Sequence, residues 1–155
     1  MKSEYLAAMK ADLLETYKSD LCEDSIEAVQ KAQTLQEFIN VLHTYSAFLK
    51  YKSIPKIDWI RKWFTDHRNE AEQYGCYIDR IVSITNPTQP IVAFGTSNIS
   101  LVINKAGVYN ITLHDDTYCS IVAYYTSMVR VRQKDNSQVH VLHKSNSSII
   151  KIRKV

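Results

Sequence analysis

The sequence predicts an α+β protein in which a helical segment, residues 1–75, precedes a β-repeat array, residues 76–155. Apolar residues recur in the first segment at the three- and four-residue spacing of amphipathic helices. In the second segment, short runs of alternating apolar residues are separated by polar turns. These runs also recur at a fixed interval, so we expect the array to be a regular stack of similar units.

Capping signals divide the first segment into helices. Thr34 and Glu37 have the spacing of a capping box at the start of one helix. Asp24 or Ser25 is a suitable N-cap for the helix that precedes it in the sequence. Pro55 is expected to interrupt the helical pattern, and Gly75 to end it. The expected helices cover residues 3–19, 25–32, 34–50 and 56–74.

The fourth expected helix has a broad apolar face that includes Trp59 and Trp63. Such a face usually packs into the core. A partner-binding face is the alternative, because Arg61 and Lys62 lie among the aromatic residues and could suit nucleic acid. Acidic residues on the same helix largely cancel that charge, which favours the core.

The array is built on a ten-residue unit whose first position is small or hydroxylated. That position holds Ser97, Gly107, Thr117, Ser127, Ser137 and Ser147. The match is closer at twenty residues, where the aliphatic pairs are Ile81 and Val82, Leu101 and Val102, Ile121 and Val122, and Val141 and Leu142. A twenty-residue repeat is typical of coils stacked at the spacing of adjacent strands.

A β-solenoid is therefore favoured. It predicts columns of stacked side chains, with Ile99 over Cys119 over Val139 inside the coil. An antiparallel meander of short strands is the alternative, since it also gives a period near ten residues.

Strict alternation in the coils predicts an apolar stripe on the outside of the solenoid. Its expected members are Val82, Val102, Val122 and Leu142. Three interpretations remain open: the N-terminal helices cover the stripe, identical subunits pair through it, or a bend turns both neighbouring residues inward.

The charges are unevenly distributed. Residues 1–76 carry 10 Lys/Arg and 12 Asp/Glu, whereas residues 77–155 carry 9 and 4. The basic excess could attract a polyanion, or it could solubilise an exposed end and discourage pairing of open sheet edges. The candidate polyanion face comprises Arg130, Arg132, Lys134, Lys144, Lys151, Arg153 and Lys154.

The sequence offers weak candidates for chemistry. Cys119 is expected in the interior, where a thiol is inert. His140 and His143 would lie on opposite faces of a strand, so they suit a shared metal poorly. The turn at residues 114–116 could bind a cation or act in acid–base catalysis, although a solvated turn is the simpler interpretation. We therefore expect no enzyme activity, catalytic residue, metal or cofactor.

The three cysteines, an odd number without paired spacing, favour a reducing cytoplasmic setting over a disulfide framework. No apolar run is long enough to cross a membrane, and the N-terminal residues do not have the pattern of a signal peptide. We therefore expect a soluble cytoplasmic protein that does not act at membranes.

Residues 47–64, which read AFLKYKSIPKIDWIRKWF, together with the repeats, resemble small uncharacterised proteins from Bacteroidales genomes. Some of those proteins lie in phage-like or mobile regions, so the resemblance implies a phage or mobile-element accessory protein. It implies no functional residues.

The sequence thus predicts a non-enzymatic structural or protein-interaction module that forms homo-oligomers. The alternative is a nucleic-acid-binding accessory protein that uses the basic C-terminal coils.

Overall fold

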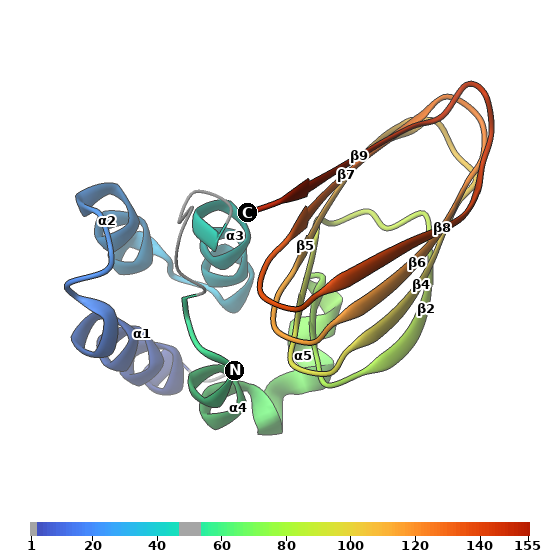
Figure 1. The fold of residues 1–155 in the computed structure, drawn as a ribbon. Helices are drawn as coiled ribbons and strands as arrows, with labels where there is room; N and C mark the ends of the chain where they lie inside the picture. The colour runs from blue at the N-terminus through green and yellow to red at the C-terminus, as the bar shows by residue number, and fades with distance from the viewer. Residues whose placement is uncertain (1–2, 47–53) are drawn as a thin grey trace.

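The computed structural model describes residues 3–46 and 54–155, which form a layer of helices packed against a β-solenoid (Figure 1). The α+β class and the solenoid are confirmed. Every strand pairing in these residues is parallel, so the antiparallel meander is wrong. The helical elements are α1 (Ser3–Tyr17), α2 (Glu23–Lys31), α3 (Leu35–Ser46), α4 (Ile57–Phe64), the 3-10 turn η1 (Thr65–His67) and α5 (Arg68–Gln73).

The capping signals have different outcomes. The capping box at α3 is confirmed, because the Glu37 N–H donates to Thr34 Oγ1 at 3.1 Å and the Thr34 N–H donates to Glu37 Oε2 at 3.1 Å. The N-cap prediction for α2 is wrong: Cys22 is the cap, and the Ser25 hydroxyl donates to the Cys22 carbonyl. Residues 47–50, which we expected to continue the third helix, lie outside the described residues.

The fourth expected helix is divided into α4, η1 and α5. Its apolar face is core, since Trp59, Ile60 and Phe64 are buried against the other helices. Gly75 ends the segment in the left-handed region with φ +80°, as its sequence position predicts.

The solenoid consists of two parallel sheets, each contributing one strand to every coil (Figure 1). We name the sheet with strand order β1-β3-β5-β7-β9 sheet A, and the sheet with order β2-β4-β6-β8 sheet B. Sheet A contains β1 (Cys76–Ile78), β3 (Ile91–Phe94), β5 (Gly107–Leu113), β7 (Ser127–Gln133) and β9 (Ile149–Lys154). Sheet B contains β2 (Ile81–Thr85), β4 (Asn98–Ile103), β6 (Tyr118–Ala123) and β8 (Gln138–Lys144).

The twenty-residue register holds through the middle coils. Ile99 stacks on Cys119 and Cys119 on Val139, so the predicted interior column is confirmed. The register fails at both ends of the solenoid. The first coil is shorter, because Cys76 pairs with Val92, and the last is longer by one residue, because Met128 pairs with Ile149.

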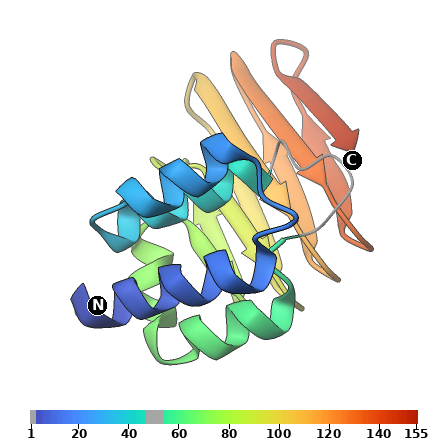
Figure 2. The same ribbon diagram turned by 90° about the vertical axis from the view of Figure 1, so that its left-hand side faces the viewer.

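Two hydrophobic clusters explain how the helices dock. The interior of the solenoid is one cluster, formed by the inward residues of both sheets such as Leu101 and Ile121. The second cluster joins the helices to the outer face of the first strands of sheet A, through Cys76, Ile78, Val92 and Phe94. Strand β3 is therefore buried on both faces. Strands β7 and β9 extend beyond the helical layer (Figure 2).

Candidate interaction surfaces

The structure changes the membership of the predicted outer stripe. Val102 and Val122 are neighbours in register, and both are half-buried on the outer face of sheet B. Val82 is not part of the stripe, because the short first coil pairs it with the inward residue Ile99. Leu142 also leaves the stripe, since the register shifts after Ile121 and pairs Val122 with His143.

The three interpretations of the stripe can be compared with this register. Within the described residues, the helices cover sheet A and not the outer face of sheet B, so the interpretation that they cover the stripe is wrong. Residues on β4 alternate between fully buried and half-buried, which leaves no bend that turns both neighbours inward. A two-residue apolar patch flanked by Thr85 and His143 is a small surface for association.

A larger apolar surface lies at the last coil. Val141 stacks on Ile121, and Ile152 stacks on Val131, so both side chains continue interior columns. Ile121 and Val131 are at most 1% exposed, whereas Val141 is 39% and Ile152 44% exposed. Leu142 and Ile149 add exposed aliphatic groups beside them. We call this surface the open end.

Among the residues that the structure describes, the backbone at the open end is also unpaired along one side. Strands β8 and β9 are the outermost strands of their sheets. Such edges present rows of free N–H and C=O groups that can pair with another strand. At the opposite end of sheet A, α4 and α5 contact β1.

The predicted polyanion face is only partly assembled. Arg130 pairs with Lys151, and Arg132 with Arg153, so four cations form two adjacent rows on the outer face of sheet A. We call these four residues the cationic face. Arg130, Lys151 and Arg153 are exposed, and Arg132 is half-buried.

The remaining predicted cations lie elsewhere. Lys134 is 3% exposed, and burial lowers the pKa of its ammonium group. Lys144 belongs to β8 of the other sheet, where its ammonium group donates to the Ser148 carbonyl. Lys154 pairs with Gln133, which in turn pairs with the buried Leu113, so Lys154 belongs to a column on the inner side of sheet A. These three residues are not part of the cationic face.

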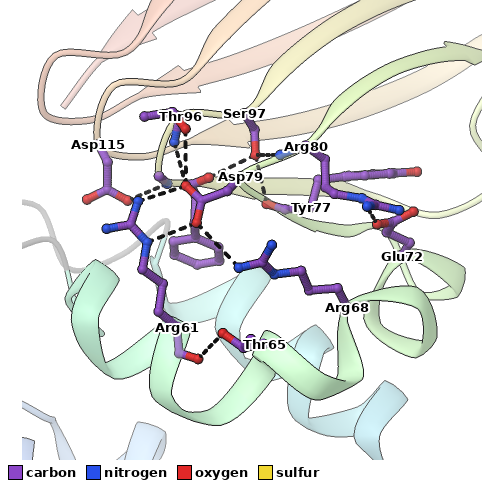
Figure 3. Close-up of polar contacts among 12 residues, drawn as sticks. Arg61, Thr65, Arg68, Glu72, Tyr77, Asp79, Arg80, Thr96, Ser97 and Asp115 are labelled. Atoms are coloured by element: carbon purple, nitrogen blue, oxygen red, sulfur yellow. Dashed lines mark hydrogen bonds and ion pairs between the residues drawn. The ribbon is translucent and has the colours of Figure 1, made fainter.

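Sequence reasoning missed a polar site that joins α4 to the first corner of the solenoid (Figure 3). Arg61 donates to both carboxylate oxygens of Asp79, from Nε at 2.9 Å and from an η nitrogen at 2.8 Å. Thr96 donates to Asp79 Oδ1 from its backbone and its hydroxyl at 3.0 and 3.2 Å. Arg68 approaches Asp79 Oδ2 at 3.8 Å.

These contacts make Asp79 a structural anion. The hydrogen bonds from Arg61, opposed by partial burial, lower the pKa of Asp79 to about 2. A carboxylate with this pKa and these donors is a poor proton acceptor at neutral pH. The site therefore attaches the helical layer to the solenoid, and we find no acid–base role for it.

Asp79 begins a column of turn residues at this corner. Asp79, Gly95, Asp115 and Asp135 have φ between 51° and 70°. Each later aspartate accepts a backbone hydrogen bond from the preceding coil: Gly95 N–H donates to Asp115 Oδ2 at 2.9 Å, and Asp115 N–H to Asp135 Oδ2 at 3.1 Å. Aspartate tolerates the left-handed region and bonds locally, which suits this corner.

The turn at residues 114–116 is arranged differently from a catalytic site. The His114 ring is buried and stacks on Phe94 with a centroid distance of 4.6 Å. Burial and the nearby Lys134 charge lower the pKa of His114 to about 3. The ring is therefore neutral and enclosed, and it does not share a solvent-exposed site with Asp116.

The cysteines are free thiols. Burial raises the pKa of Cys119 to about 12 and raises that of Cys76, as expected for interior positions. Cys22 is exposed, and its hydrogen bond with Ser25 lowers its pKa. Within residues 3–46 and 54–155, no three His, Cys, Asp or Glu side chains are grouped as metal ligands.

Across the same described ranges, none of the helices combines the length and apolar character needed to cross a bilayer. Comparison of the chain with models of protein families, with curated proteins and with solved structures gave no match.

Proposed function

We propose that this protein is a non-enzymatic interaction module that self-associates through the open end of its solenoid. The observation that carries the proposal is the exposure of Val141 and Ile152, which stack on the buried residues Ile121 and Val131 of the preceding coil. Each aliphatic side chain removed from water contributes on the order of 1 kcal/mol when it is already half-buried.

A second copy of the same open end is the occupant that fits best. Two last coils related by a twofold axis place aliphatic groups of one copy against those of the other. The unpaired backbone of β8 or β9 in one copy can then pair with its equivalent in the other. The surface is thus self-complementary in both apolar area and hydrogen bonding.

Charge sets the conditions for this association. Lys151 and Arg153 project from the outer face of β9, away from the surface at which the two open ends would meet. They approach the same residues of the second copy, and like charges near each other oppose pairing. Salt screens this repulsion while strengthening burial of apolar groups, so self-association should increase with ionic strength.

The candidate catalytic groups support a non-enzymatic role. The Asp79 carboxylate is held by Arg61 and Thr96, and the His114 ring is enclosed against Phe94.

The test compares Val141→Lys with Ile81→Lys by sedimentation velocity over a range of concentrations. Ile81 is 90% exposed on β2, the first strand of sheet B, so Ile81→Lys adds the same charge far from the open end. We expect the wild type and Ile81→Lys to dimerise and Val141→Lys to stay monomeric. Thermal unfolding of both variants verifies that they fold. A wild-type protein that is monomeric at every concentration, or equal association of the two variants, would overturn the proposal.

A further inference from the structure

The cationic face has a geometry that the open end does not explain. Parallel strands place Arg130 beside Lys151 and Arg132 beside Arg153, about 4.8 Å apart at the backbone. The two rows are separated by two residues along the strand, so all four side chains leave the same side of sheet A. Strands β7 and β9 carry no acidic residue. None of the four cations forms an ion pair with any residue in the described ranges.

Polar groups continue these rows on the neighbouring strand. Asn110 on β5 pairs with Arg130, and Thr112 pairs with Arg132. Asn110 is half-buried and offers an amide group beside the cations, whereas Thr112 is fully buried. Arginine supplies three of the four cations, and its planar fork matches the paired oxygens of a phosphate.

The helical layer limits the shape of the partner. Burial, together with the nearby charge of Arg132, lowers the pKa of His43 on α3 to about 4, so Arg132 lies close to this helix. The row at Arg132 therefore lies near α3, and the helices project from the same side of sheet A (Figures 1 and 2). A planar bilayer would meet the helices before it reached the row at Arg132. A narrow polyanion can lie along the rows.

From this we infer that the cationic face binds the phosphate backbone of a nucleic acid, without reading its sequence. Three arginines and a lysine on one sheet, with no ion pair among the described residues and with the helical layer beside them, fit a linear polyanion. Binding of this kind rests on release of counterions from the phosphates and is therefore steeply salt-dependent. It does not require the dimer, because one copy carries both rows.

The experiment measures polarisation of a short fluorescent DNA duplex and of the matching single strand with the full chain. Four phosphate contacts predict that duplex affinity falls roughly 100-fold between about 50 mM and about 200 mM salt. The variant Arg130→Gln/Lys151→Gln should weaken binding at least about tenfold at the lower salt and reduce the salt slope by about two. Arg153→Gln serves as a second, single variant at an exposed position.

The matched control is Lys18→Gln/Lys105→Gln, which removes two exposed charges outside the cationic face. It should bind nearly as well as the wild type. Absence of any polarisation change at low salt would overturn the inference, and so would equal losses in the two double variants. Vesicles of phosphatidylserine and phosphatidylcholine form the third arm. Binding to vesicles without binding to DNA would contradict the nucleic-acid assignment.

Discussion

The guanidinium of Arg61 on α4 and the carboxylate of Asp79 after β1 form a two-point contact between the helical layer and the solenoid. The pair is 18 residues apart in sequence, and it joins α4 to the first corner of the solenoid. Because Asp79 also accepts hydrogen bonds from Thr96 of the next coil, one carboxylate links three segments.

Replacing Asp79 by Asn should destabilise the fold by roughly 2 kcal/mol, because a charge-assisted contact to Arg61 is lost. Asn is the suitable replacement since it tolerates the positive φ of 51° at this position. Urea unfolding measures the change. A double-mutant cycle with Arg61→Ala isolates the pair, and additive losses in the cycle would contradict a direct coupling.

Acid should weaken this junction through Asp79. The folded pKa of Asp79, about 2, lies below the ordinary value of 3.8, so its stabilising contribution is fully present above about pH 4. It is lost as the pH falls toward 2. In Asp79→Asn this part of the acid sensitivity should disappear, as measured by chemical unfolding at a series of pH values.

As the pH is lowered, a loss of stability through protonation of His114 in the unfolded chain should begin at a higher pH than the loss through Asp79. The folded pKa of His114, about 3, is below the ordinary 6.5, so the unfolded chain binds a proton that the folded protein excludes. Stability therefore falls as the pH drops below 6.5. His114→Phe, which keeps the stacking on Phe94, should reduce the slope between about pH 5 and 6 by about 1.4 kcal/mol per pH unit.

His43 leaves a slope in that variant, because its pKa is also lowered, to about 4. His140→Gln is the matched control, since His140 is exposed on β8. An unchanged slope in His114→Phe would show that the buried ring is protonated in the folded state.

Gly75 should tolerate no side chain. Its φ of +80° disfavours other residues, and a Cβ there would lie 2.1 Å from the Pro90 carbonyl oxygen. We expect Gly75→Ala to cost at least about 2 kcal/mol. Gly107→Ala is the comparison: its φ of +159° also disfavours alanine, but its Cβ would meet only the Tyr109 side chain, at an ordinary 3.4 Å. Equal melting temperatures for the two variants would contradict this account.

The solenoid could be predicted because its middle coils share one length. Ile99, Cys119 and Val139 fall into one column by counting twenty residues. The same counting placed Val82 outside, because nothing in the residues marks the first coil as shorter. The extra residue near Leu142 is a local register shift that a period cannot predict.

The sequence carries a partial signal of where the helices dock on the solenoid. The continuous apolar run of β3, Ile91–Phe94, indicates a strand buried on both faces, and Phe94 does contact the helical cluster. The contact of Arg61 with Asp79 had no such signal, because it depends on how α4 crosses the first corner. The sequence predicted a group of basic residues in the last coils. Which of them lie together on the cationic face follows only from the pairing of β7 with β9.

The most direct test of the central claim is the solution mass by light scattering at about 50 mM and about 500 mM salt, without and with DNA. Association through the open end predicts a mass that rises toward the dimer at the higher salt without DNA. The cationic face predicts a gain of mass with DNA only at the lower salt. A monomer at both salt concentrations without DNA would contradict self-association through the last coil.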